Sequence, residues 1–600
     1  MQAIILAAGM GKRLKELTQN NTKCMVKVNG VSLIERLLRQ LERIDLSRIV
    51  IVTGYEGKKL IDYIETFGIK TPIIYVDNPV FDKTNNIYSL SLAKEYMKED
   101  DSLLFESDII FEEKVLLSLI NDPRKTLALV DEYKPWMDGT CIRLDENDKI
   151  IDFISGKKFD FTNTIGCFKT VNIYKFSRHF SEKQYIPFLE AYQTALGVNE
   201  YYEQVLNVIT TLDGTEIEGK RLSGEKWYEI DDEQDLDIAE TIFDENIDGK
   251  VLRLEERYGG YWRFPELVDF CYLVNPYYPP KKLCDEIKAS FNTLLTEYPS
   301  GMRVNSLLAA KNFGVHKENI VVGNGAAELI KALMGYIDGK IGIIRPTFEE
   351  YPNRYDATKI VVYEPEKKDY SYTANDLMHY YENKDISSLL LINPDNPSGN
   401  YIDEEGMRLL IKWTESHGIR LIVDESFIDF AEDNTTYIKQ DIITQNKHLY
   451  VVKSISKSYG VPGLRLGVLA SGDEKAIEGI KKEVSIWNIN SFAEFYMQIQ
   501  EKYKKDYVFA LEKFKAERKR LFEELSKIDY VNVIPTQANY FMIELVNKFD
   551  AHELTNVLLD RYNILVKDLS TKVGKNYIRI AIRNMEDDDK LIYALKEIGN

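Results

Sequence analysis

Lys457 is the residue whose type and surroundings most directly suggest covalent chemistry. It follows an apolar run, Leu449 to Val452, that predicts a short buried strand. The hydroxyl groups and glycines of residues 454–467 surround it in sequence, and Arg465 lies in the same stretch. A lysine at a strand end, beside groups that bind anions, can hold an aldehyde cofactor as a Schiff base. From these residues alone, a solvated loop rich in serine and lysine explains the stretch equally well.

Two other apolar runs in the same half also end in polar side chains. Residues 388–392 lead to Asn396, and residues 420–423 lead directly to Asp424. Polar groups at the carboxyl ends of parallel strands build the ligand site of α/β sheets. Asp424 can pair with a protonated pyridine nitrogen, Asn396 can bond a phenolic oxygen of the same ring, and Lys457 can carry a proton between carbon atoms. Together these residues predict a site for pyridoxal 5'-phosphate.

An anchor for the phosphate of such a cofactor is present as well. Hydroxyl and guanidinium groups donate hydrogen bonds to phosphate, and the backbone N–H groups at a helix N-terminus attract anions. The predicted phosphate ligands are Ser454, Ser456, Arg465 and the backbone of Gly325, Ala326 and Ala327.

The N-terminal half opens on a different kind of anion site. The apolar run Ala3–Leu6 predicts a strand, and a turn of small residues follows it. Such a turn lets backbone N–H groups approach a triphosphate, and the basic side chains at its end add positive charge. The predicted nucleotide-binding residues are Leu6, Ala7, Ala8, Gly9, Gly11, Lys12, Arg13 and, further on, Lys23. A helix at residues 33–41 and a second strand at residues 49–53 complete a βαβ unit. Before that helix, residues 24–26 are predicted to form a further short strand, flanked by Lys23 and Lys27.

Acidic side chains in this half suggest a metal site. The apolar run 102–105 leads to Asp108, and much later Asp231 follows a strand-like stretch, with Glu229 and Asp232 nearby. Two carboxylates that share Mg²⁺ can stabilise charge at an attacked phosphorus. The alternative is that such acids cap helices, and Asp232 is placed to do so.

Composition limits the classes of function. The 600 residues are too many for one core, so two or more domains are expected. A net charge of −19 argues against nucleic acid as a partner. The five cysteines form no CxxC pair, which indicates reduced thiols. With no signal peptide and no apolar run of membrane length, we expect a cytoplasmic protein without a membrane partner.

The N-terminal motifs resemble those of the sugar-nucleotide-pyrophosphorylase-type nucleotidyltransferases, most closely the phosphocholine cytidylyltransferase branch. The residues that carry this resemblance are Leu6–Leu14, Lys23, Asp108 and Glu229–Asp231. The resemblance implies a Rossmann-like fold and attack of a phosphoryl oxygen on the α-phosphate of CTP. It implies that Arg13 and Lys23 neutralise the phosphates while Asp108 and Asp231 hold Mg²⁺. Thr22 stands where the family commonly has proline.

The acceptor pocket is less defined by the sequence. Residues 82–90 resemble the Asn-Asn-x-Tyr-Ser segment of that branch, which implies that Asn86 lies near the acceptor. Trp136 can surround an ammonium group by cation–π attraction, or it can simply pack against the sheet. We therefore expect a small aminated phospho-compound as the acceptor.

The C-terminal motifs resemble the fold-type I pyridoxal-phosphate aminotransferases of class I/II, most closely the histidinol-phosphate aminotransferase branch. The matching segments are Asn275–Tyr277, Tyr298–Pro299, Gly323–Glu328, Pro346–Tyr351 and the strand ends at Asn396, Asp424 and Lys457. The resemblance implies that Tyr351 stacks on the cofactor ring and that Arg579 binds the carboxylate of an amino-acid donor. It also implies a homodimer in which Tyr298 reaches the cofactor phosphate of the partner subunit. Phe427 stands where the family usually has tyrosine.

The sequence thus predicts two α/β domains joined by a linker. We assign residues 1–243 to the nucleotidyltransferase domain, residues 244–262 to a charge-rich linker and residues 263–600 to the aminotransferase domain. The fusion resembles bifunctional enzymes that join a 2-aminoethylphosphonate cytidylyltransferase to a 2-aminoethylphosphonate transaminase. This implies transamination of phosphonoacetaldehyde, then coupling of the product to CTP.

Three alternatives stay open at this stage. The second half can be a phosphothreonine-type decarboxylase that supplies an amino-alcohol phosphate. The acceptor can be phosphocholine. One half can be a non-catalytic binding or dimerising scaffold, although the presence of Lys457, Asp424, Asp108 and Asp231 argues against it.

Overall fold

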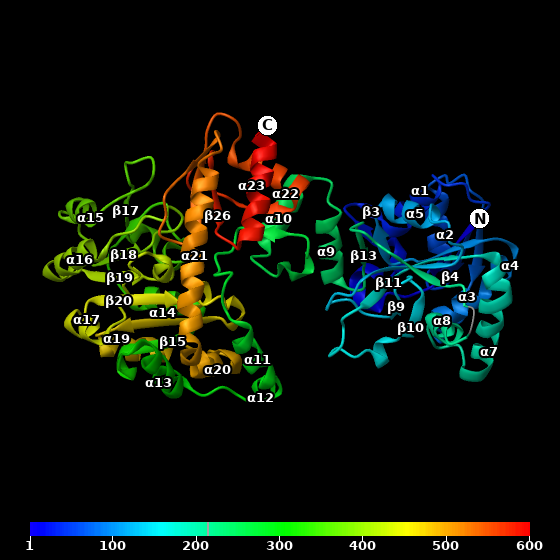
Figure 1. The fold of residues 1–600 in the computed structure, drawn as a ribbon, viewed down its shortest axis with the longest axis horizontal. Coiled ribbons are helices and arrows are strands. Elements are labelled where there is room, and N and C mark those ends of the chain that lie inside the picture. Colours follow the sequence, from blue (N-terminus) through cyan, green and yellow to red (C-terminus); the bar gives the residue numbers. More distant parts are fainter. Residues whose placement is uncertain (213–214, 600) are drawn as a thin grey trace. The chain divides into compact units, whose positions relative to one another are not determined.

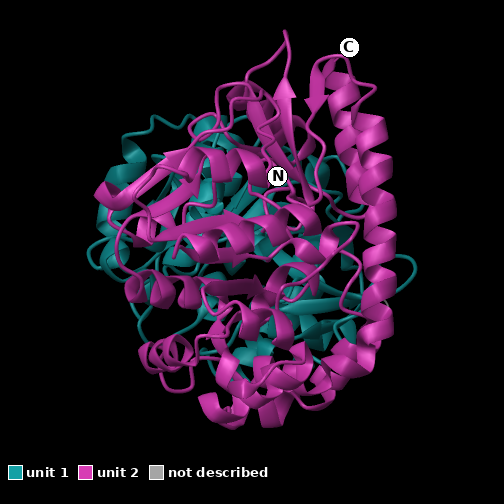
Figure 2. Ribbon diagram, turned by 90° about the vertical axis from the view of Figure 1, so that its left-hand side faces the viewer, with its two compact units in different colours: residues 1–263 teal, residues 264–600 magenta. Residues whose placement is uncertain are grey.

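A computed structural model describes residues 1–212 and 215–599. The chain forms two compact units, Met1–Arg263 and Phe264–Asn600, coloured separately in Figure 2. Within the predicted linker, residues 247–256 form helix α10 (Ile247–Glu256), whose Val251 and Leu254 are buried. An ion pair of 2.9 Å joins Arg253 of α10 to Glu240 of α9 (Glu233–Ile242). This part of the predicted linker is therefore a packed helix of unit 1.

Unit 1 is built on a sheet whose central strand is β1. Strand β1 pairs in parallel with β4 and β6, and β5 continues the sheet beyond β4. On the other side β11 pairs antiparallel to β6. These strands are β1 (Gln2–Ala7), β4 (Ile49–Thr53), β5 (Ile73–Asp77), β6 (Ser102–Glu106) and β11 (Cys167–Phe176). The predicted βαβ unit is present, and β1 and β6 end side by side.

The apolar run of β1 is continuous because both of its faces are covered. Ala3 and Ile5 belong to one buried cluster, while Ile4 and Leu6 belong to another on the opposite face. Successive side chains of a strand point to opposite faces of the sheet. A strand with one face in solvent therefore alternates apolar and polar residues, whereas a strand covered on both faces is apolar throughout.

Two local predictions in unit 1 have different outcomes. The predicted helix is α1 (Leu33–Leu41), and the side chain of Ser32 caps it by accepting from Glu35 N. The strand-like residues 24–26 are instead part of a 3₁₀ turn at Lys23–Met25, so that prediction is wrong. The backbone N–H groups of Met25 and Val26 donate to Thr22 O and Lys23 O, both at 3.1 Å. These local hydrogen bonds use the N–H groups that pairing with another strand would need.

Unit 2 contains a seven-stranded sheet in the order β15-β21-β20-β19-β18-β16-β17, parallel except at β21. Its strands are β15 (Ile320–Asn324), β16 (Ile341–Ile344), β17 (Ile360–Tyr363), β18 (Ser388–Ile392), β19 (Arg420–Asp424), β20 (Leu449–Ser454) and β21 (Leu466–Ser471). The three strands predicted from their apolar runs are β18, β19 and β20, which are neighbours in register. Their carboxyl ends, with the polar groups that follow, therefore meet at one edge.

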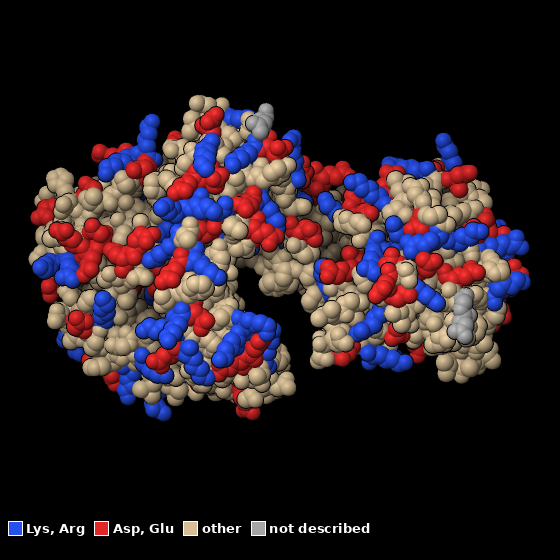
Figure 3. All heavy atoms as spheres, in the orientation of Figure 1, with Lys and Arg blue, Asp and Glu red and all other residues tan. Residues whose placement is uncertain are grey.

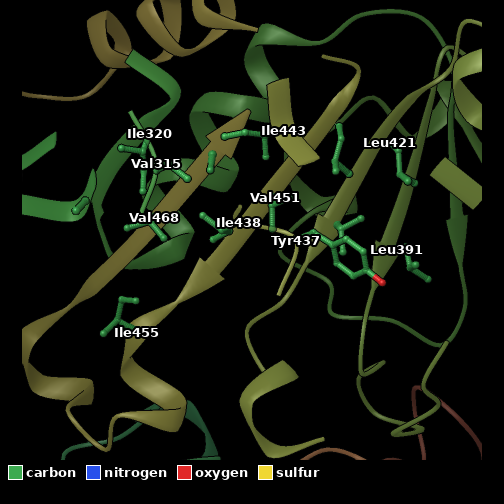
Figure 4. Close-up of a cluster of buried hydrophobic side chains, with 14 of the residues drawn as sticks. Val315, Ile320, Leu391, Leu421, Tyr437, Ile438, Ile443, Val451, Ile455 and Val468 are labelled. Atoms are coloured by element: carbon green, nitrogen blue, oxygen red, sulfur yellow. The ribbon is translucent and has the colours of Figure 1, made fainter. Parts of the chain in front are cut away.

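The core of unit 2 lies against this sheet. Leu391, Leu421 and Val451 come from successive strands and pack in one buried cluster, part of which Figure 4 draws. Leu390, Ile422 and Val452, one residue away in each strand, pack in a second cluster on the other face. Burying each of these side chains stabilises the unit by about 2 kcal/mol before conformational entropy is counted, so the packing fixes the register of the strand ends.

A smaller antiparallel sheet completes unit 2, in the order β22-β23-β26-β25. Its strand β26 (Tyr577–Ala581) carries Arg579, and the helix α21 (Lys504–Leu525) is the long orange helix of Figure 1. The remaining strands are β22 (Val531–Val533), β23 (Tyr540–Leu545) and β25 (Lys567–Asp568). The predicted α/β class is confirmed for both units.

The surface is mixed in charge. On the face that Figure 3 shows, basic and acidic side chains of the described residues are interspersed. Within residues 1–212 and 215–599, no helix has the length and apolar character needed to cross a bilayer.

Candidate functional site

A cavity of about 400 Å³ opens where β1 and β6 end in unit 1. It brings together most of the residues that the sequence predicted for nucleotide, metal and acceptor. Those that line it are Leu6, Ala8, Gly9, Gly11, Lys12, Arg13, Lys23, Asn86, Asp108 and Asp231. Ala7 is buried in the last position of β1. Trp136 is not part of the lining, and its ring lies 5.7 Å from the guanidinium carbon of Arg263.

The predicted phosphate turn depends on the backbone of one glycine. Gly11 has φ +59°, a left-handed conformation that side chains disfavour. A Cβ there would lie 3.1 Å from the Cβ of Lys23, and the hydroxyl of Thr18 donates to Gly11 O at 2.8 Å. Gly11 therefore lets the turn close over Lys23.

Three carboxylates gather at one end of the cavity. One oxygen from each of Asp108, Glu229 and Asp231 lies within 4.8 Å of the other two. Glu229 was absent from the predicted ligand pair. The signal for it was available, because residues two apart in an extended segment point to the same side. Strand β13 (Trp227–Glu229) pairs with β7 (Ile109–Phe111), which places Glu229 beside Asp108.

Basic side chains neutralise these acids. The ammonium of Lys23 lies 2.6 Å from Asp108 Oδ2 and 2.7 Å from Asp231 Oδ1, and Arg13 contacts the same Asp231 oxygen at 2.8 Å. Burial by itself lowers the pKa of Lys23, but the two carboxylates outweigh it and raise the pKa above its ordinary value. Burial likewise opposes ionisation of Asp231, yet Lys23 and Arg13 hold its pKa below the ordinary value. The shifts favour the charged forms of both Lys23 and Asp231.

The cavity also contains acids that sequence reasoning missed. Glu106 and Glu203 both line it, and Asn86 joins their segments. Asn86 Nδ2 donates to Glu106 Oε1 at 3.0 Å, and Asn86 Oδ1 accepts from Tyr202 N at 3.0 Å. Burial raises the pKa of Glu203 to about 7. Lys169 is directed elsewhere, with its ammonium 3.2 Å from Glu229 Oε2.

In unit 2, Lys457 lies in the short helix α18 (Ile455–Ser458) directly after β20. Asp424 is the last residue of β19, only 3% exposed, and accepts from Ser426 N at 2.8 Å. Burial lowers the pKa of Lys457 to about 8, helped by Arg579 and Arg465 and opposed by Asp424. A larger fraction of Lys457 than of an ordinary lysine is therefore unprotonated at neutral pH, which favours its use as a nucleophile.

The surroundings of Asn396 differ from the expectation based on a tyrosine near it. Phe427 packs edge-on against Tyr540, with ring centroids 5.2 Å apart, and the hydroxyl of Tyr540 donates to the backbone oxygen of Asp395. The Oδ1 of Asn396 instead accepts from Arg579 Nη1 at 2.8 Å. Arg579 thus orients the Asn396 amide through its oxygen, and the amide N–H groups can donate to a ligand.

Tyr351 is fully buried, and its hydroxyl donates to Asp424 Oδ2 at 2.8 Å. Its predicted stacking on a cofactor ring stays a prediction. Tyr298 is 78% exposed and stacks on Trp487 with centroids 4.5 Å apart. Its predicted reach into a partner subunit is likewise not decided by a single chain.

An anion cradle lies beside Lys457. Helix α14 (Gly325–Tyr336) begins at Gly325, whose φ is +73°. A Cβ on Gly325 would lie 2.6 Å from Arg465 Nη2, so only glycine admits this guanidinium to the helix N-terminus. The hydroxyl oxygen of Ser456 is buried and has no hydrogen-bond partner among the described residues. A guanidinium, an unpaired hydroxyl and a helix N-terminus together suit a phosphate group.

Arg579 is a second guanidinium whose charge acts on Lys457. Its Nη2 donates to Cys271 O at 3.0 Å, and its Nε is buried without a partner among the described residues. A guanidinium held in this way keeps donor capacity for a carboxylate or a phosphoryl group.

Comparisons with known proteins agree with the division of the chain into two units of different families. The family model for aminotransferase class I and II matches residues 290–598, and the model for the MobA-like NTP transferase domain matches residues 3–136. CMP-5'-(3-aminopropyl)phosphonate synthase of Streptomyces rubellomurinus is 28% identical over 100% of this chain and 95% of its own length.

The C-terminal half has relatives of its own. L-serine phosphate decarboxylase of Sulfurospirillum multivorans is 34% identical over 56% of this chain and 90% of its own length. The crystal structure of histidinol-phosphate aminotransferase from Clostridium acetobutylicum is 27% identical, with a TM-score of 0.50, covering 56% of this chain and 99% of that one. The chain belongs to the aminotransferase class I and II family, and a MobA-like NTP transferase domain precedes that family's fold on the same polypeptide.

Proposed function

We propose that unit 1 transfers CMP from CTP to the phosphoryl oxygen of a small aminated phosphonate or phosphate, releasing pyrophosphate, and that unit 2 makes the amine of that acceptor. The observation that carries the proposal is the pair of sites on one chain. One site clusters Asp108, Glu229 and Asp231 with Lys23 beside a phosphate-type turn. The other holds Lys457, with its lowered pKa, beside an anion cradle.

In unit 1, Arg13 and Lys23 would neutralise the phosphates of CTP. Both now neutralise Asp231, so they are already oriented toward the proposed metal ligands. Asp108, Glu229 and Asp231 offer the oxygen ligands that Mg²⁺ prefers, and their mutual spacing fits one ion. Mg²⁺ bound there would stabilise the negative charge that develops at the attacked phosphorus. The turn Leu6–Arg13 would hold the triphosphate through its backbone N–H groups.

In unit 2, the residues fit pyridoxal phosphate. The unpaired hydroxyl of Ser456, Arg465 and the N-terminus of α14 at Ala326 and Ala327 would hold its phosphate. Ser454 lies at the end of β20 beside them. Pyridoxal phosphate supplies an electron sink for the electrons released at the substrate's α-carbon.

The protein supplies the remaining functions of that site. Asp424 would bind the ring nitrogen in its protonated form, and Asn396 would donate its amide N–H to the phenolic oxygen. Lys457 would hold the cofactor and, once freed, move the proton at the α-carbon. Arg579 would bind the substrate's anionic group, since its Nε has no partner among the described residues. We also propose a homodimer, in line with the exposed Tyr298.

The acceptor that we propose is 2-aminoethylphosphonate, made in unit 2 by transfer of an amino group from an amino-acid donor to phosphonoacetaldehyde. The full-length relative at 28% identity, whose name describes a CMP ester of an aminoalkyl phosphonate, supports a substrate of this class. Products of unit 2 that carry both an amine and a phosphonate are then the acceptors of unit 1.

A second candidate reaction for unit 2 is decarboxylation of a phosphorylated amino acid. The relative at 34% identity, named L-serine phosphate decarboxylase, favours it. Loss of carbon dioxide from O-phosphoserine gives O-phosphoethanolamine, which unit 1 could couple to CTP. The same Lys457 and Asp424 serve either reaction, because both labilise a bond at the α-carbon.

The purified chain can be tested with three substrate sets. With phosphonoacetaldehyde and amino-acid donors, we expect 2-aminoethylphosphonate; with O-phosphoserine or O-phosphothreonine, release of carbon dioxide would select the second candidate. With CTP and each amine product, we expect pyrophosphate, and ATP, GTP and UTP serve as controls for the base. Absence of pyrophosphate with every acceptor and nucleotide would overturn the proposal for unit 1.

A further inference from the structure

The cavity of unit 1 contains two carboxylates, Glu106 and Glu203, that the proposed CMP transfer does not use. Glu203 lines the cavity, is only 4% exposed, and its Oε2 has no hydrogen-bond partner among the described residues. A buried charge without a partner is costly, and natural proteins keep such a group where a ligand completes it. Because burial raises the pKa of Glu203 to about 7, the side chain also gains from a nearby positive charge.

The structure holds Glu203 opposite a second carboxylate. Asn86 spans the two segments, since its Nδ2 donates to Glu106 Oε1 at 3.0 Å and its Oδ1 accepts from Tyr202 N at 3.0 Å. One amide thus fixes the positions of Glu106 and Glu203 in the same cavity.

Lys169 and Lys23 form their ion pairs with other carboxylates, although the charge of Lys169 also acts on Glu203 and lowers its pKa. Lys169 is 1% exposed and directs its ammonium to Glu229 Oε2 at 3.2 Å and to Thr170 O at 2.8 Å. Lys23 contacts Asp108 and Asp231 at the metal-binding end. The cavity therefore contains cations and metal ligands for phosphates, and also two carboxylates, Glu106 and Glu203, for which the described residues provide no ion pair.

We propose that Glu203, braced by Asn86 and assisted by Glu106, is the subsite for the primary ammonium group of the acceptor. This inference rests on the proposed CMP transfer in unit 1 and narrows its substrate class. The phosphoryl group of the acceptor lies beside Arg13 and Lys23, and its ammonium donates hydrogen bonds to Glu203 and Glu106. Tyr201, which also lines the cavity, offers its ring to the same cation.

The chemistry of the subsite discriminates between acceptors. A primary ammonium has three N–H donors and can satisfy Glu203 Oε2 directly. A trimethylammonium group has none and keeps the carboxylate at the distance of its methyl groups, so Oε2 stays unbonded. The subsite therefore selects aminoalkyl phosphonates and phosphates over phosphocholine.

The variant Glu203→Gln tests the subsite, with Glu200→Gln as the matched control. Glu200 lies three residues earlier and is not part of the cavity lining, so the control makes the same change of charge outside the site. We expect Glu203→Gln to raise the KM for 2-aminoethylphosphonate by about 10- to 100-fold, the loss of one charged hydrogen bond. The KM for CTP should not change in either variant, which also reports correct folding.

Two further measurements keep the outcome independent of turnover and of folding. Calorimetric titration of 2-aminoethylphosphonate into each protein measures binding without pyrophosphate release. Ethylphosphonate, which lacks the amine, should bind the unaltered protein at least about tenfold more weakly than 2-aminoethylphosphonate. Equal binding of the two compounds, or an unchanged affinity in Glu203→Gln, would overturn the subsite. Absence of pyrophosphate release with intact, Glu203-dependent binding would instead contradict the CMP transfer and leave the subsite standing.

Discussion

Each unit holds a partly buried lysine in a candidate site, and the pKa values of the two lysines are shifted in opposite directions. Lys23 lies between Asp108 and Asp231, and these carboxylates raise its pKa above the ordinary value. Lys457 is buried near Arg579 and Arg465, and its pKa falls to about 8. Burial lowers the pKa of both, so the neighbouring charges decide the difference.

The opposite shifts match opposite tasks. A lysine that accompanies phosphates must remain a cation throughout the reaction, and two acids at less than 3 Å ensure this for Lys23. A lysine that attacks a carbonyl must lose its proton near neutral pH, and the guanidinium groups near Lys457 favour that loss. The same residue type therefore serves as a fixed charge in one unit and as a nucleophile in the other.

Replacing Lys457 with alanine should separate the two units most strongly. Without its amine, formation of the acceptor's amine should fall by about 10³-fold or more, and the visible absorbance of the bound cofactor should disappear. Pyrophosphate release from CTP and added 2-aminoethylphosphonate should remain. Amine formation that survives the change would show that Lys457 is not the nucleophile.

Asp231→Asn should produce the complementary defect. It removes a charge that Lys23, Arg13 and the proposed Mg²⁺ all contact, so pyrophosphate release should fall by about 10²-fold or more. Chelation of divalent cations should have the same effect on the unaltered protein and leave amine formation intact. If chelation spares pyrophosphate release, the three carboxylates do not serve a metal.

Gly325→Ala tests the anion cradle beside Lys457. The added Cβ would meet Arg465 Nη2 at 2.6 Å in a left-handed backbone, and we expect about tenfold weaker binding of pyridoxal phosphate. Gly335→Ala is the control, because it lies in the same helix and its Cβ would meet nothing within 4 Å. Equal cofactor affinity in the two variants would contradict the cradle.

The smallest expected effect is a shift along the pH axis. Because the pKa of Lys457 is about 8, it is mostly protonated below pH 8, and the rate at which cofactor-free protein takes up pyridoxal phosphate should rise through that pH. Arg579→Gln removes a positive charge that lowers this pKa, so the midpoint should move to higher pH, by about one unit at most. Stopped-flow absorbance measures the midpoint, and a downward shift would contradict the electrostatic account.

Local sequence patterns predicted much of the fold. The apolar runs of β18, β19 and β20 and the polar residues behind them were readable because a parallel sheet aligns carboxyl ends at one edge. The turn Leu6–Arg13 was readable because small residues and a left-handed glycine are needed at one defined point. The 3₁₀ turn at Lys23–Met25 could not be predicted, since a pattern of three residues does not distinguish a turn from a strand.

Contacts between segments distant in the chain could not be predicted from the sequence. Tyr202 N bonds Asn86 across 116 positions, and no spacing rule links Glu106 to Glu203. Trp136 suits an ammonium site by its chemistry, yet it lies under Arg263 and outside the cavity. The hydrogen-bond partner of Asn396 also depends on tertiary packing. Phe427 packs against Tyr540, and Arg579 donates the hydrogen bond to the Asn396 amide oxygen.

The sequence by itself determined that this chain has two α/β halves, one with a phosphate-type turn and acids, the other with a lysine, an aspartate and an asparagine at strand ends. Such features depend on residues close together in the chain, whose geometry local dihedral preferences largely define. Only the tertiary structure decided which charges surround each lysine, and therefore that Lys23 stays a cation while Lys457 approaches a free amine. Electrostatic energy depends on distance and burial, and these exist only once the chain has folded.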